Sequence, residues 1–242
     1  MERLKELYNK IGNNSICFLF INKNKNKKIG GIFLSVLLFD LDGTLVETTR
    51  LSIPIIHAEI KNYPHLKVPN PKKIQSAFGL PHKEFWELLT PDATEQEVRM
   101  ISERSEKELL ESLKTENVLL PYAREVLTEL KRRGHILSTA SNCSTAYLNE
   151  ILNSQQIKDL FYEPLCIERV GGRKKKDILL AHFQHLNKSD AFMIGDRSSD
   201  IEAAKAHHVP AIACHFGYAE DGELEDADYH IYCLKDLLEI FN

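Results

Sequence analysis

The sequence predicts an α/β fold in which a parallel sheet carries helices on both faces and a helical segment is inserted after the first strand. Three observations lead to this prediction. From Val36 onward, short apolar runs alternate with helical segments. Residues 47–120 interrupt that alternation and contain no convincing strand. Two of the apolar runs end directly in acidic residues, Asp40 and Asp196, and ligands of such folds bind at the carboxyl ends of the strands.

Five short apolar runs are predicted to form the strands of the sheet, since strands buried on both faces are continuously apolar. They are Val36–Asp40, His135–Ala140, Leu165–Ile167, Ala191–Gly195 and Pro210–Cys214. The helices predicted between them are Ser144–Asn153, Lys176–Leu186 and Ser198–His207. A further helix is predicted to open in its first turn at Pro121 and to end near Gly134, a residue suited to a helix C-terminus.

Residues 47–120 are predicted to form a small helical domain of their own. A long charged helix is expected over Thr94–Asn117, where Thr94 and Glu97 have the spacing of a capping box. A second helix is given an apolar face by Phe85, Trp86, Leu88 and Leu89.

The first 35 residues differ in charge from the rest of the chain. They hold seven basic and two acidic side chains, a charge of +5, which leaves −9 for the remainder of a chain whose net charge is −4. Asparagine and lysine alternate over Asn22–Lys28, as in a solvated loop. An address or a membrane-surface contact is one interpretation; we favour a basic N-terminal extension that takes no part in the chemistry.

Composition excludes several classes of protein. The chain has 242 residues, 43% hydrophobic and 27% charged, which is ordinary for a globular protein. Its net charge of −4 argues against a nucleic-acid partner, and no apolar run approaches the roughly 20 residues of a membrane-spanning helix. The five cysteines form no CxxC pair, which favours reduced thiols and a cytoplasmic location.

The run Phe39–Leu45 carries the strongest chemical signal. Its two carboxylates, Asp40 and Asp42, lie two residues apart at a strand end and are predicted to project toward one side. Two neighbouring carboxylates need a counter-charge, which a divalent cation supplies. Gly43 permits a tight turn, and Thr44 offers a hydroxyl and a backbone N–H to an anion.

A second acidic motif lies at Met193–Asp200. Asp196 ends an apolar run, and Asp200 follows four residues later, on the same face if a helix starts there. Magnesium prefers a few carboxylates, water and phosphate oxygens, so Asp40, Asp196 and Asp200 form a candidate site.

Ser141–Asn142 follows another strand and offers hydrogen bonds to phosphate. The cluster Arg173–Lys176 contains a lysine that would neutralise phosphate charge.

These motifs, in this order, resemble those of the haloacid dehalogenase superfamily, and within it the phosphoglycolate phosphatase-like members. The pattern DxDGT occurs at Asp40–Thr44 and GDxxxD at Gly195–Asp200, with Ser141 and a lysine between them. The resemblance runs from about Val36 to the C-terminus. It implies a Rossmann-like catalytic core over 36–46 and 121–242, with a helical cap domain over 47–120.

The resemblance also implies roles for individual residues and Mg²⁺ as the cofactor. Asp40 would be the nucleophile and Asp42 the general acid and base. The catalytic set is then Asp40, Asp42, Ser141 and Lys175. The phosphate-binding set is Thr44, Ser141, Asn142 and Lys175, and the metal-binding set is Asp40, Asp42, Asp196 and Asp200.

The chain departs from the family pattern at two places. Glu47 is the usual acid after the first motif, but Thr48 follows it. Three adjacent lysines stand where the family has one lysine with a nearby proline. Lys175 aligns best, while Lys174 and Lys176 remain alternatives.

The predicted function is hydrolysis of a small phosphorylated metabolite, phosphoglycolate-like, by a monomer or homodimer. A pyrophosphatase or nucleotide phosphatase would use the same chemistry. A sugar-phosphate mutase is a further alternative, which Thr44 disfavours, since the mutases that the chain resembles usually carry a smaller apolar residue there. A dehalogenase has no use for the acid and base Asp42. A non-catalytic binding protein on the same fold is the alternative from another class.

Overall fold

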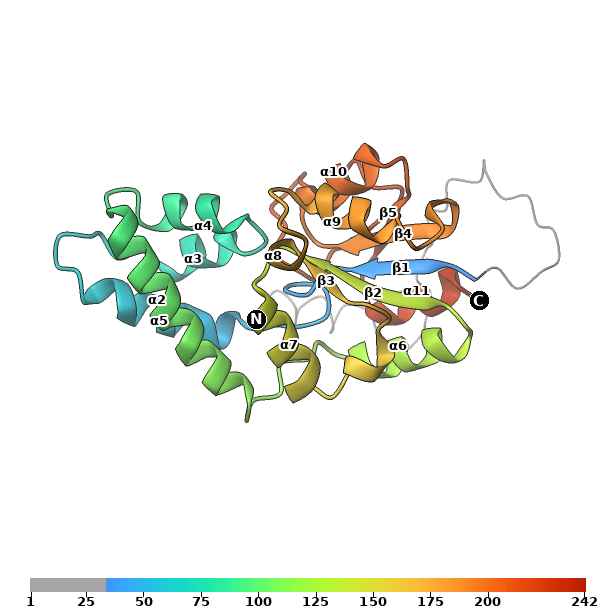
Figure 1. The fold of residues 1–242 in the computed structure, drawn as a ribbon, viewed down its shortest axis with the longest axis horizontal. Helices are drawn as coiled ribbons and strands as arrows, with labels where there is room; N and C mark the ends of the chain where they lie inside the picture. The colour runs from blue at the N-terminus through green and yellow to red at the C-terminus, as the bar shows by residue number, and fades with distance from the viewer. Residues whose placement is uncertain (1–33) are drawn as a thin grey trace. The chain divides into compact units, whose positions relative to one another are not determined.

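The computed structural model describes residues 34–242, and the sequence predictions for residues 1–33 lie outside them. The core is a six-stranded parallel sheet in the order β3-β2-β1-β4-β5-β6, shown in Figure 1. The strands are β1 Val36–Phe39, β2 Ile136–Ser141, β3 Leu165–Cys166, β4 Ala191–Gly195, β5 Ala211–Cys214 and β6 Tyr229–Ile231. The predicted α/β class with a parallel, Rossmann-like sheet is therefore confirmed.

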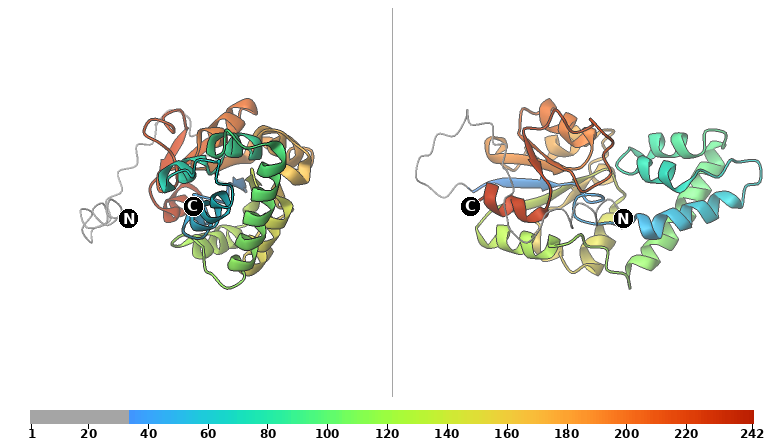
Figure 2. Two further views of the ribbon diagram at one scale, coloured as in Figure 1. Left: turned by 90° about the vertical axis from the view of Figure 1, so that its left-hand side faces the viewer. Right: turned by 180° about the vertical axis from the view of Figure 1, so that it is seen from behind.

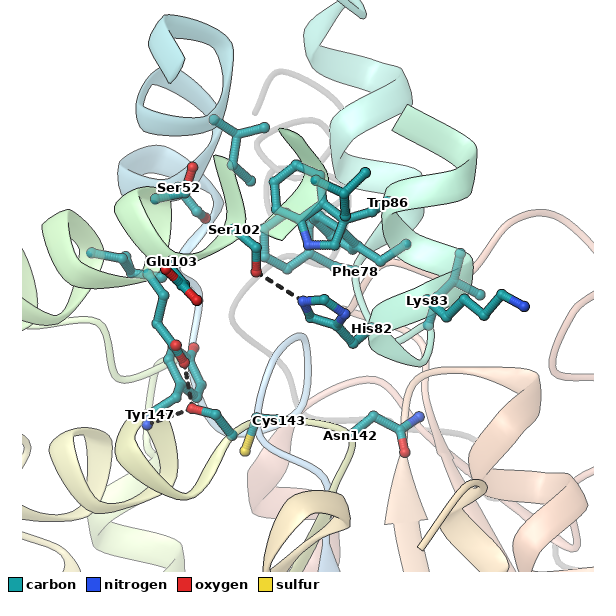
Figure 3. A pocket seen from close by; sticks show the side chains of 18 of the residues that line it. Ser52, Phe78, His82, Lys83, Trp86, Ser102, Glu103, Asn142, Cys143 and Tyr147 are labelled. Atoms are coloured by element: carbon teal, nitrogen blue, oxygen red, sulfur yellow. Dashed lines mark hydrogen bonds between the residues drawn. The ribbon is translucent and has the colours of Figure 1, made fainter. Parts of the chain in front are cut away.

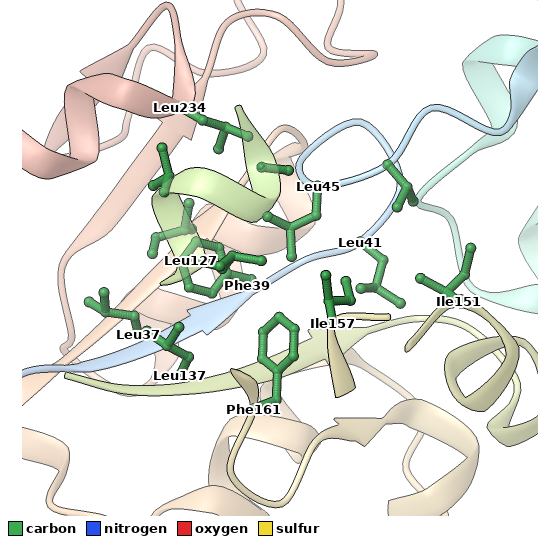
Figure 4. Close-up of a cluster of buried hydrophobic side chains, with 14 of the residues drawn as sticks. Leu37, Phe39, Leu41, Leu45, Leu127, Leu137, Ile151, Ile157, Phe161 and Leu234 are labelled. Carbon is green, nitrogen blue, oxygen red and sulfur yellow. The ribbon is translucent and has the colours of Figure 1, made fainter. Parts of the chain in front are cut away.

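The side chains of β1 alternate between the two faces of the sheet, as the pleat of a strand requires. Leu37 and Phe39 pack on one face with α6 (Ala123–Arg132), α7 (Thr145–Ser154) and α11 (Leu237–Ile240). Figure 4 shows this cluster, including the edge-to-face contact of Phe39 with Phe161. Val36 and Leu38 pack on the other face with α9 (Lys175–His182) and α10 (Ser198–Ala206). The further views in Figure 2 show helices on both sides of the sheet.

The second face carries α9 (Lys175–His182) and α10 (Ser198–Ala206), while α8 (Ile167–Val170) follows β3 directly. Three short 3₁₀ helices, Lys158–Leu160, Lys188–Asp190 and Leu234–Asp236, complete the connections. Among the helices of residues 34–242, none has the length and apolar composition that crossing a bilayer requires.

Four helices occupy the insert: α2 (Thr49–Lys61), α3 (Pro71–Ala77), α4 (His82–Leu89) and α5 (Glu95–Leu113). They share a separate apolar cluster that contains Ile60, Ile74, Trp86 and Ile101. The predicted capping box is present at the start of α5, where Thr94 and Glu97 bond reciprocally. Figure 1 shows these helices next to the carboxyl ends of the strands.

Both ends of the insert meet at a short neck. Val46 and Leu119 form an isolated antiparallel bridge. The backbone N–H of Glu47 donates to the carbonyl of Val118, 2.8 Å away, and the N–H of Leu120 donates to the carbonyl of Leu45, 2.9 Å away. The segments that enter and leave the insert are therefore held side by side.

Several element boundaries differ from the sequence prediction. The helix expected to open at Pro121 begins at Ala123. Tyr122 has a left-handed conformation with φ 67°, which cannot be part of a right-handed helix. The C-terminus of this helix follows the prediction: Gly134 has φ +93°, a conformation open to glycine. The helix expected over Lys176–Leu186 ends at His182, and the helix expected to reach Asn117 ends at Leu113.

Candidate active site

Three carboxylates from two distant motifs meet at the carboxyl edge of the sheet. Asp40 directly follows β1, Asp196 directly follows β4, and Asp200 lies in the first turn of α10. One carboxylate oxygen from each residue lies within 4.8 Å of the other two. All three side chains are buried, with exposed fractions of 2%, 0% and 1%. The parallel pairing of β1 with β4 produces this meeting.

Lys175, the first residue of α9, binds two of these carboxylates. Its Nζ lies 2.7 Å from Oδ2 of Asp40 and 2.5 Å from Oδ1 of Asp200. Burial lowers the pKa of Lys175, but the neighbouring carboxylates of Asp200 and Asp40 outweigh burial and raise it above its usual value. Lys174 and Lys176 are exposed, so Lys175 is the lysine of the three that lies in this cluster.

When all three carboxylates are ionised, one ammonium faces three negative charges. Burial, together with repulsion from Asp40 and Asp200, holds the pKa of Asp196 well above its usual range. Burial also raises the pKa of Asp200, and the Lys175 ammonium opposes that rise. A buried set of oxygen donors with uncompensated negative charge suits a hard divalent cation, so these residues fit Mg²⁺.

The position of Asp196 is fixed from several sides. Thr44 Oγ1 donates to its Oδ1 at 3.2 Å, and the backbone N–H of Tyr218 donates to its Oδ2 at 2.6 Å. Gly43 has φ +76°, and a Cβ atom there would lie 2.1 Å from Asp196 Oδ2. Glycine is therefore required at this position for both its conformation and its size.

Asp42 lies outside the group of three carboxylates. Its Oδ1 accepts hydrogen bonds from Thr48 Oγ1 at 2.5 Å and from the Tyr147 hydroxyl at 2.8 Å. Burial raises the pKa of Asp42 to about 6, although both hydrogen bonds oppose the shift. A carboxyl group with this pKa both donates and accepts a proton near neutral pH. The role of Asp42 as a metal ligand stays a prediction.

Ser141 and Asn142 stand at the end of β2 and line the same pocket as Asp40 and Asp42. The amide Nδ2 of Asn142 donates to the carbonyl of Gly79 in the insert at 3.0 Å. Its Oδ1 is buried and has no hydrogen-bond partner among the described residues. Phosphate binding by these two residues and by Thr44 stays a prediction.

Sequence reasoning missed two connections to the site. Tyr147, on α7, reaches Asp42 across 105 positions of sequence, and no spacing rule identifies such a contact. Arg197 follows Asp196; its Nε donates to Glu223 at 2.8 Å and its Nη1 donates to the carbonyls of Ser76 and Phe78 in the insert. Because Arg197 lies inside the second acidic motif, the sequence indicates that it is near the site. The sequence does not indicate that Arg197 contacts the insert.

Comparison with known protein families decides the classification. The family model described as haloacid dehalogenase-like hydrolase matches residues 37–214, well over half of the chain. The chain belongs to the haloacid dehalogenase-like hydrolase family. The resemblance inferred from the motifs is thereby confirmed.

Curated relatives within this hydrolase family are phosphatases. The chain is 26% identical over 194 residues to a phosphoglycolate phosphatase of Haemophilus influenzae, covering 74% of this chain and 85% of the relative. It is 28% identical over 200 residues to the phosphoglycolate phosphatase of Colwellia psychrerythraea, covering 76% and 85%. Together with the family match, these relatives make the chain a phosphatase-type enzyme.

The fold is shared with solved structures. A predicted phosphoglycolate phosphatase from Haemophilus somnus has a TM-score of 0.78 at 22% identity, covering 88% of this chain and all of the other. At this identity the likeness concerns the fold alone.

Proposed function

We propose that this hydrolase is a Mg²⁺-dependent phosphatase that cleaves phosphomonoesters through a phospho-aspartate on Asp40. The observation that carries the proposal is the double ion pair of Lys175. This ion pair holds Asp40 at the strand end, beside Asp196 and Asp200. Asp42 lines the same pocket as Asp40 and has a raised pKa. A fixed carboxylate nucleophile beside a carboxyl group suited to proton transfer is the arrangement that two-step ester hydrolysis needs.

In the first step, an Asp40 carboxylate oxygen attacks phosphorus, and the bond from phosphorus to the alcohol oxygen breaks. Protonated Asp42 gives its proton to the departing alcohol oxygen. The ammonium of Lys175 stabilises negative charge on the transferring phosphoryl group. The Ser141 hydroxyl and the Asn142 amide Nδ2 donate hydrogen bonds to the phosphoryl oxygens. Nδ2 has two hydrogens, of which one is donated to the Gly79 carbonyl.

In the second step, water attacks the phosphorus of phospho-aspartate, and the bond from phosphorus to the Asp40 oxygen breaks. Asp42, now a carboxylate, takes a proton from the attacking water, which restores both carboxyl groups to their starting forms. The pKa of about 6 allows the same residue to act in both directions near neutral pH.

Asp40, Asp196 and Asp200 are the residues proposed to hold Mg²⁺. When bound, the ion would neutralise charge on the carboxylates and on the substrate phosphate. The negative charge that Lys175 leaves uncompensated supports this assignment.

We propose that residues 47–120 act as a cap over a catalytic core made of 36–46 and 121–242. The separate apolar cluster of the insert and its neck support this division. The names of the relatives make phosphoglycolate the first substrate to test. Transfer to a sugar instead of water, or hydrolysis of pyrophosphate or nucleotides, would use the same residues. The cytoplasmic location and the monomeric or dimeric state stay predictions.

A phosphate-release assay tests the proposal. We expect Mg²⁺-dependent hydrolysis of p-nitrophenyl phosphate, with loss of at least about a hundredfold in rate for Asp40→Asn, since an amide is a poor nucleophile. Circular dichroism should show that the variant is folded. Full activity of the wild type in excess chelator would contradict the metal requirement. A folded Asp40→Asn variant that retains more than about a hundredth of the rate would rule out Asp40 as the nucleophile.

A further inference from the structure

The catalytic carboxylates open into a cavity of about 930 Å³ between the sheet edge and the inserted helices. Figure 3 shows residues of both regions around it. Cavities of roughly 300–1,000 Å³ hold ligands of drug size. The alcohol portion of the substrate therefore has room for far more than the two carbons of a glycolate.

One wall of the cavity is apolar. It is formed by side chains from α2 and α4 and from the segment between α3 and α4: Ile55, Ile56, Phe78, Leu80, Phe85 and Trp86. Phe78 and Phe85 meet edge to face with ring centres 5.7 Å apart, and Phe85 meets Trp86 at 5.1 Å. Such a wall favours an apolar body, because transfer of that body from water to the cavity is favourable.

The charges around the cavity are predominantly negative. Besides Asp40 and Asp42, five glutamates line it against one lysine and one arginine, a formal net charge of −3. The glutamates are Glu87, Glu95, Glu103, Glu106 and Glu168. A second anionic group on the substrate would meet this negative field in addition to that of the catalytic carboxylates.

Both cations of the lining have acidic neighbours. Lys83 Nζ lies 3.6 Å from Glu87, and Figure 3 shows its side chain extending away from the middle of the cavity. Arg99 stands on α5 with Glu95 four residues before it and Glu103 four residues after it, so it has an acid on either side along the same helix face. Lys175 is occupied by Asp40 and Asp200.

Glu106 is linked through Ser144 to Tyr147, the residue that holds the catalytic acid. It accepts a hydrogen bond from Ser144 Oγ, which in turn accepts the backbone N–H of Tyr147 at 3.0 Å. Tyr147 donates its hydroxyl to Asp42. The neighbouring Ser105 also lines the cavity, is 5% exposed, and has a hydroxyl without a hydrogen-bond partner among the described residues. This wall thus offers the negative charge of Glu103 and Glu106 to the cavity, while the Ser105 hydroxyl is buried behind it.

On the basis of the phosphatase function proposed above, we propose that the preferred substrates are phosphomonoesters of alcohols with an apolar body and a protonated amine. The apolar wall takes the body, and the α5 face with Glu103 and Glu106 takes the amine. An alcohol that carries a carboxylate, such as glycolate, is disfavoured by the same glutamates.

Three para-substituted phenyl phosphates of similar size test this preference. They carry an aminomethyl, a methyl or a carboxyl group, so the charge at the far end of the alcohol is the variable of interest. We expect kcat/KM to fall in that order, with at least about a tenfold difference between the amine and the carboxylate, and the difference to shrink as salt increases.

The double variant Glu103→Gln with Glu106→Gln is expected to reduce the ratio of amine to carboxylate by about threefold or more, because two charges leave the wall. Glu108→Gln is the matched control, since Glu108 lies on the same helix but does not line the cavity. The control variant should keep the wild-type ratio.

The outcomes separate this proposal from the phosphatase function. Hydrolysis of all three esters with the carboxylate equal to or better than the amine would overturn the substrate preference and leave the phosphatase function standing. An amine preference that the double variant retains in full would remove the glutamates as its cause and overturn the assignment. Hydrolysis of p-nitrophenyl phosphate but of none of the three would overturn the preference alone, and hydrolysis of none of the four would overturn the phosphatase function and the preference with it.

Discussion

The edge of the sheet and the inner face of α5 both present acidic side chains to one cavity, but they hold them differently. At the sheet edge, Asp40 lines the cavity, is buried, and shares the ammonium of Lys175 with Asp200 behind it, at 2.7 and 2.5 Å. On α5, Glu103 is exposed and Glu106 is half-buried. Buried charges require fixed partners, whereas exposed charges in water do not. The buried, ion-paired acids of the sheet edge suit catalysis, which requires a fixed geometry. The more exposed glutamates of α5 suit selection among substrates.

If this contrast is right, changes at the sheet edge should have the largest effects. Lys175→Met is expected to lower turnover more than about a hundredfold, because phosphoryl charge loses its neutralising partner. It should also lower the melting temperature, since removing one partner of a buried ion pair costs about 3–5 kcal/mol. Turnover and thermal unfolding measure these two effects.

Lys176→Met, an exposed neighbour, is the matched control and should change neither quantity. Normal turnover by Lys175→Met would show that the buried ion pair serves the fold alone.

Asp42→Asn is expected to reduce turnover by about 10²–10⁴-fold, because an amide transfers no proton. The loss should be smaller for p-nitrophenyl phosphate than for an alkyl phosphate, since nitrophenolate leaves without protonation. Steady-state rates on both substrates, with phosphate release followed after rapid mixing, measure the difference. Equal losses on both would indicate that Asp42 acts mainly in the water-dependent second step, and no loss on either would remove it from the mechanism.

Tyr147→Phe should have an intermediate effect, because Tyr147 positions Asp42 without itself touching the reacting atoms. Removing its hydroxyl deletes the 2.8 Å hydrogen bond to Asp42, and a hydrogen bond to a charged group contributes about 1.5–3 kcal/mol. We expect turnover to fall by about tenfold, with a smaller change in KM. Tyr162→Phe, at an exposed tyrosine, is the control. An effect on KM alone would mean that Tyr147 contacts substrate instead.

Deleting residues 1–28 should have the smallest effect, since every residue assigned to the sheet edge or to the inner face of α5 lies after position 34. Turnover of p-nitrophenyl phosphate should stay within about threefold of the full chain. The deletion stops before Leu34 and Ser35, because the N–H of Ser35 donates to His135 Nδ1 at 3.1 Å. A folded truncation without activity would show that the extension contributes to the site, and loss of folding would show that it belongs to the core.

The sequence alone predicts the buried strands of the sheet better than its short edge strand. The strands Val36–Phe39 and Ala191–Gly195 and the acids that follow them were found because a buried parallel strand is continuously apolar and its end is marked by a change to polar residues. β6, Tyr229–Ile231, was missed because it is three residues long at the edge of the sheet and contains an exposed histidine.

Contacts made by distant residues were the part that the sequence did not predict. The motifs identified Asp42, but not that Thr48 and Tyr147 hold its carboxylate. Likewise, spacing left three lysines as alternatives, and burial at the start of α9 distinguishes Lys175 from its neighbours. Helical periodicity specifies which side of α5 faces inward, but the composition of a cavity depends on every element around it.

The neck at Val46 and Leu119 has a consequence for how such a protein changes over generations. The bridge holds both ends of the insert together. For the folding of the sheet, the whole insert therefore counts as one closed loop. The entropy cost of closing a loop grows only logarithmically, by about 0.6 kcal/mol for each doubling of length. Helices in this loop can therefore be lengthened, shortened or exchanged with little cost to the folding of the sheet, so new specificities can be acquired while the machinery of catalysis is inherited unchanged.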